Sequence, residues 1–363
     1  MALLLVINPG ATSTKVAIFD DENRLYNETI DHSDDINHFK RIYDQREYRG
    51  NLVWKWLSGK SLQVSDLDGI VSRGGILKPM IGGTYHINQL MIDDLQKADY
   101  GEHASNLGAI IAWDLGAEYA LPLFIVDPVS VDEYIPEAHI SGLKDIPRNS
   151  MAHTLNCRAV AIRYAAEVGC PYKKLRLIVV HLGAGISVTV HLGGRLIDSN
   201  NPHEAGPMCP DRAGTLPTKD LVHLAYSGKY DEYGLIKKIQ REGGLYDHLG
   251  TKDLRVAEKM AAEGNKYAVL VLRAMVYQIA KEIGAMSTVL EGDIDGIIIT
   301  GGMANSKWLQ TELLKRISFI APVILKPGEK EMEALAEGAL RVLNGKEQAR
   351  DYQEQISPDK KLA

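Results

Sequence analysis

A strand–turn–strand pattern occurs twice in this chain, and the duplication is the feature that most constrains its fold. The apolar run Leu3–Ile7 leads into a polar turn and then into a second apolar run that ends at Phe19. The same pattern begins again at Leu177, where His181 takes the place of Asn8, 173 residues further on. An offset of nearly half the chain indicates a duplicated domain, because solenoid repeats recur every ~20–50 residues. Two unrelated hairpins are the alternative interpretation.

The length and the alternation of segments predict an α/β protein. A chain of 363 residues fits about two domains. Short β-rich runs that stop at polar turns alternate with apolar stripes of helical spacing, which we expect as helices over 104–117, 267–290 and 332–343. The chain is predicted to cross between its halves within 145–151, and the polar segment after Gly345 is expected to fray. In such sheets ligands bind beyond the carboxyl ends of the strands.

Composition narrows the function classes. Lys and Arg number 41 against 47 Asp and Glu, a net charge of −6 without basic runs, so neither nucleic acid nor an anionic membrane is expected as a partner. No uncharged apolar stretch reaches the ~18 residues of a membrane span. The apolar start lacks the basic residues of a signal peptide. The three cysteines show no metal-ligand spacing, which favours a reduced cytoplasmic protein.

Two of the turns offer groups that suit phosphate. The turn Asn8–Lys15 carries backbone N–H groups, three hydroxyls, an amide and an ammonium within eight residues. Such a hairpin can wrap a phosphate through its backbone donors, although a plain solvated turn is an equal alternative. The second turn, His181–Gly185, is small enough to let phosphates approach the backbone, and Thr300–Asn305 could pass close to a flat adenine or ribose. Each also has the alternative of a simple packing turn.

Other polar residues stand at turns without forming a motif by themselves. Ser58–Ser61 ends like a P-loop but lacks the first glycine and a preceding strand, and His203–Glu204 has no second histidine at zinc-binding spacing. The spacing of the remaining candidates does not show that they share one site. The alternative for each is an ordinary solvated charge at the surface, which is the usual state of such residues. The candidates are Arg73, His103, Asp127, His153, Arg212, Asp253 and Arg255.

Taken in order, these segments resemble the butyrate kinase branch of the acetate kinase family. The resemblance runs from about residue 3 to about residue 343. The segments that carry it are Val6–Lys15, Ser72–Gly75, Glu102–Leu107, Val126–Pro128, Pro147–His153, His181–Gly185, Pro210–Gly214, Gly250–Arg255, Thr300–Gly302 and Pro327–Glu331.

The resemblance implies a fold and a reaction. The fold is α/β, with two RNase H-like domains of the actin-like ATPase superfamily, mixed sheets and a nucleotide cleft between them. The N-terminal acyl and phosphate domain would span 1–148 and the C-terminal nucleotide-binding domain 149–330, with a helix at about 331–345 packing back onto the first. ATP and a short-chain carboxylate would give ADP and an acyl phosphate, reversibly and with Mg²⁺. A homodimer or higher homo-oligomer is also implied.

The resemblance also implies roles for single residues. Arg73, Asp127, His153 and Arg212 would be catalytic, while Arg73, His103 and Ala152 would line the acyl site. Glu331 would position Mg²⁺, with Glu333 as a neighbouring alternative. The nucleotide would be held by Asn8, Ser13, Lys15, His181, Gly183, Gly185, Asp253, Arg255, Gly301 and Gly302.

The chemistry suits these residue types. An aliphatic acid is already ionised at pH 7, so the nucleophile needs no general base. The obstacle is the repulsion between two anions, which arginines, a histidine and Mg²⁺ can screen.

Three positions depart from the family pattern. Ala11 replaces a hydroxyl residue, Ala152 an aromatic residue and Ala184 an Asn or Gly. The loss of the aromatic ring beside His153 would enlarge the acyl pocket. The natural acid therefore stays open among butyrate, acetate, propionate, isobutyrate and a larger branched or aromatic acid. An actin-like ATPase that is not a kinase is the alternative from another class.

Overall fold

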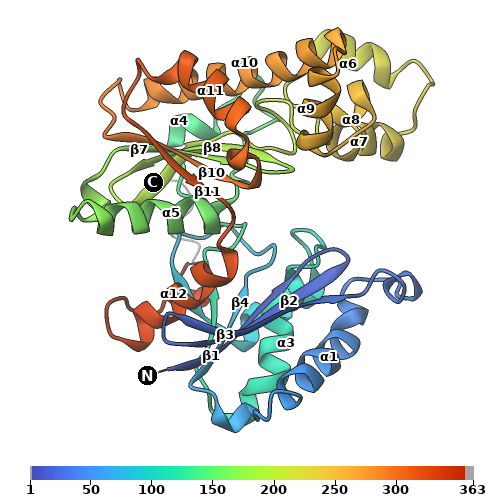
Figure 1. The fold of residues 1–363 in the computed structure, drawn as a ribbon. Coiled ribbons are helices and arrows are strands. Elements are labelled where there is room, and N and C mark those ends of the chain that lie inside the picture. Colours follow the sequence, from blue (N-terminus) through green and yellow to red (C-terminus); the bar gives the residue numbers. More distant parts are fainter. Residues whose placement is uncertain (1, 356–363) are drawn as a thin grey trace. The chain divides into compact units, whose positions relative to one another are not determined.

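The computed structural model describes residues 2–355, and its chain forms two compact units (Figure 1). The N-terminal unit is Met1–Asp132 together with Lys330–Ala363, and the C-terminal unit is Glu133–Glu329. The helix expected at about 331–345 thus belongs to the N-terminal unit. The chain enters the C-terminal unit at Glu133, whereas 148–149 stays our prediction for the boundary between folding domains.

The N-terminal unit is built on a sheet of six strands in the order β3-β2-β1-β4-β6-β5. The strands are β1 (Leu3–Pro9), β2 (Ser13–Asp20), β3 (Asn23–Asp31), β4 (Gly69–Arg73), β5 (Thr84–His86) and β6 (Leu123–Val126). The helices are α1 (Arg46–Ser58), α2 (Gln89–Lys97), α3 (Asn106–Gly116), α12 (Glu331–Leu343) and α13 (Tyr352–Gln355).

The C-terminal unit holds a sheet of five strands in the order β11-β10-β7-β8-β9. The strands are β7 (Leu177–Leu182), β8 (Ile186–Leu192), β9 (Arg195–Ser199), β10 (Gly296–Gly301) and β11 (Val323–Pro327). The helices are α4 (Pro136–His139), α5 (Thr154–Glu167), α6 (Thr218–Ala225), α7 (Glu232–Arg241), α8 (Gly244–Leu249), α9 (Leu254–Ala262), α10 (Lys266–Val289) and α11 (Lys307–Ile317).

The two sheets share one topology. In each, three consecutive strands form an antiparallel meander, and the first of the three pairs in parallel with a later strand. The series β3-β2-β1-β4-β6 in the first sheet thus corresponds to β9-β8-β7-β10-β11 in the second. This correspondence explains why the sequence pattern at Leu3 returns at Leu177.

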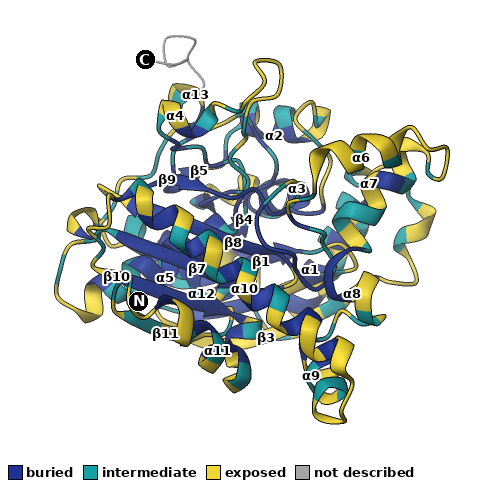
Figure 2. Cartoon of the chain, turned by 90° about the horizontal axis from the view of Figure 1, so that it is seen from above, coloured by how far each residue is buried: buried dark blue, intermediate teal, exposed yellow. Residues whose placement is uncertain are grey.

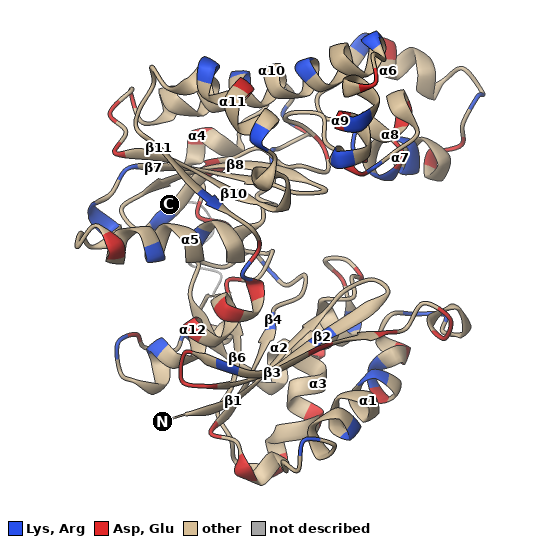
Figure 3. Cartoon of the chain, viewed as in Figure 1, with Lys and Arg blue, Asp and Glu red and all other residues tan. Residues whose placement is uncertain are grey.

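Alternation along the central strands decides which helix covers which face. On β7, Ile178 and Val180 pack in the cluster that contains α10, whereas Leu177 and Val179 pack in the cluster that contains α5. Successive side chains of a strand point to opposite faces, so a strand buried on both sides is apolar throughout. Figure 2 shows the central strands of both sheets as buried, whereas the edge strands β3 and β11 are exposed or half-buried. Figure 3 shows most charged residues on helices and loops.

The polar tail is docked where the sequence predicted fraying. The backbone N–H of Arg350 donates to the carbonyl of Thr84 at 2.8 Å, which extends the sheet beside its edge strand β5. Tyr352 is fully buried, and its hydroxyl donates to Asp94 at 2.8 Å. An open sheet edge offers unpaired backbone groups, and the buried ring adds apolar contact. The fraying prediction is therefore wrong for 350–355, and residues 356–363 lie outside the described part of the chain.

Among residues 2–355, no helix has the length and apolar character needed to span a bilayer.

Candidate active site

The first hairpin joins β1 to β2, with Asn8 opposite Lys15 in the register. Its tip residues Ala11 and Thr12 are exposed, as is Lys15, while Ser13 is half-buried. Asn8 is buried, with 4% of its surface exposed, because its side chain turns back toward α12. The hairpin therefore presents its backbone, a hydroxyl and an ammonium at the surface of the N-terminal unit.

Three predicted residues of the N-terminal unit meet at the start of α12. The side-chain N–H of Asn8 donates to Glu331 Oε2 at 2.9 Å, and Arg73 Nη1 lies 3.4 Å from Glu331 Oε1. The alternative acid, Glu333, instead pairs with Arg24 at 3.0 Å. Figure 3 shows the acidic start of α12 beside the sheet of this unit. Glu331, and not Glu333, thus stands beside the hairpin and Arg73.

Parallel strands bring further candidates to the same edge. β1, β4 and β6 run parallel side by side, so Asn8, Arg73 and Asp127 all come at or just after carboxyl ends of neighbouring strands. Asp127 is buried and has φ of +40°, and its Oδ1 accepts the N–H of Gly83 at 2.8 Å. A non-glycine residue held in this region is uncommon and clusters at functional sites. We call Asn8, Arg73, Asp127 and Glu331 the N-terminal cluster.

His103 stands on the loop that leads into α3. Its side chain is exposed, and Nδ1 lies 2.9 Å from the hydroxyl of Ser105. α3 itself approaches β4 closely, since a Cβ at Gly108 would lie 2.5 Å from the carbonyl oxygen of Arg73. The family resemblance implies that His103 lines the acyl site, and this role stays a prediction.

The second hairpin joins β7 to β8 through a tight turn. The N–H of Gly183 donates to the carbonyl of Gly185 at 3.1 Å, and Ala184 at the tip is exposed. His181 at the end of β7 is buried, with 3% of its surface exposed. Its Nε2 lies 3.6 Å from Glu329 Oε1. This turn is the counterpart of the first hairpin in the C-terminal unit.

His153 caps the start of α5 beside this hairpin. Its ring stacks on that of His181, with centroids 4.0 Å apart and an angle of 16° between the planes. Its Nδ1 lies 2.8 Å from the hydroxyl of Ser187 on β8, and its backbone N–H lies 3.3 Å from the same oxygen. The stacking and the hydroxyl fix the plane of the His153 ring.

Arg212 lies against the same turn with unsatisfied nitrogens. A Cβ at Gly185 would lie 2.5 Å from Arg212 Nη1 and 3.0 Å from His153 Cε1, so only glycine leaves room here. Nε and Nη1 of Arg212 are buried and have no hydrogen-bond partner within residues 2–355. The nearest carboxylate, Asp211 Oδ1, lies 4.0 Å from Nε and is too distant for a hydrogen bond. Burying charged donors without hydrogen bonds is costly, so the site suits an anion that can accept from them. We call His153, His181, Gly185 and Arg212 the C-terminal cluster.

The diglycine follows β10 at the next strand end. Gly301 has φ of +93°, and a Cβ there would lie 2.4 Å from the carbonyl oxygen of Leu182, so glycine is required. β10 runs parallel to β7, and Thr300 stands opposite His181. Gly302 begins a short 3₁₀ helix, Gly302–Asn305. The predicted adenosine loop therefore lies beside the strand that leads into the second hairpin.

Asp253 and Arg255 bind one another instead of joining this cluster. Asp253 caps the start of α9, and its carboxylate accepts from Arg255 Nη2 at 2.6 Å. These hydrogen bonds from Arg255 lower the pKa of Asp253 to about 2. In the part of the chain that is described, no hydrogen bond or ion pair links this exposed pair to the second hairpin. A role in nucleotide binding stays a prediction for both.

Sequence reasoning missed the residues that support the histidines. Ser187 contacts His153, while Asn156 lies 3.2 Å from Nδ1 of His181. One signal was available for Ser187, because the 173-residue offset of the sequence repeat makes it the counterpart of Thr14, which is buried in the first hairpin. No comparable signal marks Asn156, whose place on α5 depends on tertiary packing.

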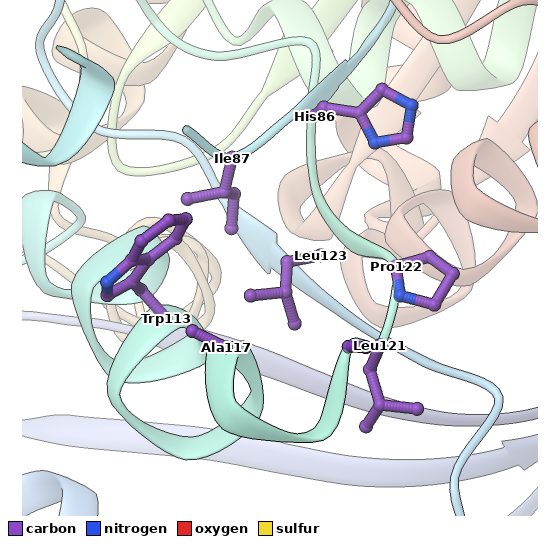
Figure 4. A pocket seen from close by; sticks show the side chains of 8 residues that line it. His86, Ile87, Trp113, Ala117, Leu121, Pro122 and Leu123 are labelled. Carbon is purple, nitrogen blue, oxygen red and sulfur yellow. The ribbon is translucent and has the colours of Figure 1, made fainter. Parts of the chain in front are cut away.

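A pocket elsewhere in the N-terminal unit has no part in this arrangement. It has a volume of about 350 Å³ and lies at the start of β6, at the end of that strand opposite to Asp127 (Figure 4). Its walls are mostly apolar and comprise His86, Ile87, Trp113, Ala117, Ala120, Leu121, Pro122 and Leu123.

Within residues 2–355, no group of three or more His, Cys, Asp or Glu side chains is arranged to hold a metal ion.

Comparison with solved structures defines the class of fold. Acetate kinase from Porphyromonas gingivalis matches with a TM-score of 0.77 at 17% identity, covering 94% of this chain and 100% of that chain. A propionate kinase from Francisella tularensis matches with a TM-score of 0.76 at 15% identity, covering 93% and 99%. The fold is therefore the actin-like ATPase fold of these kinases, with two mixed sheets, and the predicted fold class is confirmed.

Sequence comparison then gives the family. The Acetokinase family profile matches residues 146–333. Butyrate kinase 1 of Clostridium acetobutylicum is 47% identical over 354 residues, which cover 97% of this chain and 100% of the relative. Probable butyrate kinase 2 of Caldanaerobacter subterraneus is 47% identical over 353 residues, with coverage of 97% and 100%. The chain belongs to the acetokinase family, as the resemblance predicted.

Proposed function

We propose that this protein transfers the γ-phosphoryl group of ATP to butyrate, or to a branched acid of similar size, and that the reaction is reversible toward ATP. Membership of the acetokinase family makes it an ATP-dependent carboxylate phosphotransferase. The choice of acid is supported by the names of relatives that are 46–47% identical along nearly the whole chain. Kinases for acetate, propionate or larger acids are the alternatives.

The geometric observation on which the proposal depends is that two buried nitrogens of Arg212 make no hydrogen bond within the described residues. The carboxylate of Asp211 lies 4.0 Å from Nε, which is an ion pair but not a hydrogen bond. The guanidinium packs against Gly185 of the adjacent turn. A developing negative charge on a transferring phosphoryl group would satisfy these donors. Such preorganised donors stabilise charge more in the transition state than water does. An ATPase that only switches conformation would not need this arginine.

The reaction needs charge stabilisation and no general base. A carboxylate oxygen of the acid forms the new bond to the γ-phosphorus while the bond from that phosphorus to the bridging oxygen breaks, and ADP takes the electron pair. The acid is already ionised at pH 7. In this proposal Arg212 and the ring of His153 donate to the equatorial oxygens of the phosphoryl group, and Arg73 screens the incoming carboxylate.

The N-terminal cluster suits a magnesium ion. Glu331 offers a carboxylate, and Asn8, whose side-chain N–H donates to that carboxylate at 2.9 Å, also carries an amide oxygen; both lie beside a hairpin suited to phosphate. Mg²⁺ is commonly held by one or two carboxylates together with substrate phosphates and water. When bound with the nucleotide it would neutralise charge on the β- and γ-phosphates. Arg73 Nη1 lies 3.4 Å from Glu331 Oε1 and helps to orient this carboxylate.

A panel of acids with hydroxylamine trapping tests the proposal. Purified enzyme, ATP and Mg²⁺ are incubated with acetate, propionate, butyrate, isobutyrate, valerate or isovalerate, and the hydroxamate formed from each acyl phosphate is measured. Butyrate or a branched analogue should give the highest kcat/KM. ATP hydrolysis without any hydroxamate would favour the ATPase alternative and overturn the proposal.

The expected homo-oligomer and the expected cytoplasmic location stay predictions. Sedimentation velocity would test the oligomeric state.

A further inference from the structure

Arg49 is a fully buried arginine that has no carboxylate beside it. It lies on α1 with 0% of its surface exposed. Within the described residues no Asp or Glu oxygen lies within 4.0 Å of its guanidinium, although all its nitrogens have hydrogen-bond partners. Burying a charge without a counter-charge costs free energy of folding, so we expect this side chain to have a role that offsets the cost. Its hydrogen-bond partners indicate that role.

The guanidinium of Arg49 binds the underside of the first hairpin. Nη1 donates to the carbonyl of Gly10 at 2.9 Å and to that of Ser13 at 3.2 Å, while Nη2 donates to the carbonyl of Ala11 at 3.0 Å. Gln45, one turn earlier, accepts from Nε at 3.0 Å and from Nη2 at 2.7 Å. One side chain thus binds three of the four carbonyls from Gly10 to Ser13 and is itself aligned by the amide of Gln45.

His32 completes this support from the end of β3. Its backbone N–H donates to the carbonyl of Thr12 at 2.8 Å, and its Nε2 lies 2.8 Å from the hydroxyl of Thr14. Burial, together with the charge of Arg49, lowers the pKa of His32 to about 4, so the ring is neutral at pH 7. All carbonyls from Gly10 to Ser13 are therefore taken up from within the unit.

The N–H groups at the tip have no such partner. Within residues 2–355 no hydrogen bond uses the N–H of Ala11 or of Thr12, and both residues are exposed. A loop whose carbonyls are held on one side while its N–H groups stay available on the other is an anion-binding concavity. Ala11 has no hydroxyl, so its backbone N–H is the only donor it can offer.

We propose that Arg49 is a positioning residue for ATP, which holds the first hairpin with the N–H groups of Ala11 and Thr12 available to a phosphate group. This inference rests on the proposed function, because the phosphate is taken to be that of the nucleotide. Burial lowers the pKa of Arg49 to about 10, so the side chain stays charged at pH 7. The buried cation then also favours an anion on the outer side of the loop.

Three variants separate this role from a purely structural one. Arg49→Lys keeps the charge but cannot hold the planar set of acceptors, and Gln45→Met removes the amide that aligns the guanidinium. Arg46→Met is the matched control on the same helix, where the guanidinium contacts Glu47 at 3.5 Å on the surface. For each variant we would measure kcat, KM for ATP, KM for butyrate and the melting temperature with ATP or adenosine added.

Arg49→Lys should raise KM for ATP about tenfold, or ~1.4 kcal/mol, and leave KM for butyrate within about twofold. The extra rise in melting temperature that ATP gives over adenosine should shrink, and Gln45→Met should show both effects more weakly. A lower melting temperature with unchanged KM for ATP would overturn the inference, as would equal losses for both substrates.

Failure of the reaction itself is distinguishable from failure of this inference. If wild-type protein makes no acyl phosphate, the proposed function fails, while the comparison of ATP with adenosine still tests Arg49. If Arg49→Lys does not fold, Gln45→Met decides by the same criteria: an unchanged difference between ATP and adenosine overturns the role, and a reduced difference supports it.

Discussion

The rings of His153 and His181 are stacked at 4.0 Å between centroids, and the two residues come from different elements of one unit. His181 is the last residue but one of β7, and His153 precedes α5, which packs on that strand. His181 also lies 3.6 Å from Glu329 through Nε2. The buried ring of His181 therefore supports the plane of His153 and separates it from the interior of the C-terminal unit.

Ser187 should matter for turnover more than for folding. Ser187→Ala removes the hydroxyl that lies 2.8 Å from Nδ1 of His153. Loss of one hydrogen bond of this kind corresponds to roughly 0.5–1.5 kcal/mol, so we expect kcat to fall about 2–10-fold with little change in KM for ATP. Ser318→Ala, which removes an exposed hydroxyl bonded to the carbonyl of Leu314, is the control. Full activity in Ser187→Ala would show that the stacked ring needs no such support.

Arg73 and Arg212 should act on the transition state. Replacing either by Ala should lower kcat by at least ~10², because arginines that stabilise a transferring phosphoryl group are worth ~10³ or more. The melting temperature should move little, and for Arg212→Ala it should even rise slightly, since two unsatisfied buried nitrogens are removed. Arg273→Ala on the exposed side of α10 is the control. Turnover near the wild-type rate in either variant would remove that arginine from the mechanism.

Gly185 should tolerate no side chain. The added Cβ of Gly185→Ala would lie 2.5 Å from Arg212 Nη1 and 3.0 Å from His153 Cε1, so both groups must shift. A misplacement of ~1 Å in a catalytic group can lower the rate ~10²-fold, and we expect a loss of that order in kcat. Gly142→Ala meets nothing within 4 Å and serves as the control. Equal kinetics for the two variants would mean that the clash is relieved without cost.

Acid should destabilise the protein before its carboxylates protonate. Burial, the larger cause in each case, lowers the pKa of His32 to about 4 and that of His191 to about 3. Between pH 6.5 and these values the unfolded chain binds more protons than the folded chain, so stability falls as the pH falls. Each histidine contributes up to ~1.4 kcal/mol per pH unit in this window.

The melting temperature between pH 7 and pH 5 tests this dependence. His32→Gln and His191→Gln should each flatten the decline seen in the wild-type protein, whereas His38→Gln, at an exposed position, should leave it unchanged. A decline that is identical in all four proteins would show that other groups control acid stability.

The sequence predicted the fold and named the residues of the two clusters, but it did not predict the contacts between them. The strands that flank both hairpins and the helices at 104–117, 267–290 and 332–343 agree with the structure within a few residues, because apolar periodicity is a local property. The contact of Asn8 with Glu331 joins residues 323 positions apart and could not be read from spacing. No sequence pattern marks the buried Arg49, because most of its partners are backbone carbonyls of the first hairpin.

Ala152 should set the size of the preferred acid. It is buried, with 6% of its surface exposed, and precedes His153 at a position where the resemblance predicted an aromatic residue. Each buried CH₂ of a longer acyl chain contributes roughly 0.8 kcal/mol, or about fourfold in affinity. We expect kcat/KM to rise from acetate to butyrate and to stay high for isobutyrate and isovalerate.

Substitutions of graded size test this role for Ala152. Ala152→Val and Ala152→Phe should shift preference stepwise toward acetate and propionate while KM for ATP changes little, because the added atoms fill the space that a longer acyl chain would occupy. Ala262→Phe, at an exposed position on α9, is the control for the added ring. If Ala152→Phe is too unstable to assay, the valine variant decides on the same ranking of acids. A wild-type protein that prefers acetate, or a ranking that neither substitution changes, would mean that another side chain such as Met151 fills the space and fixes the pocket.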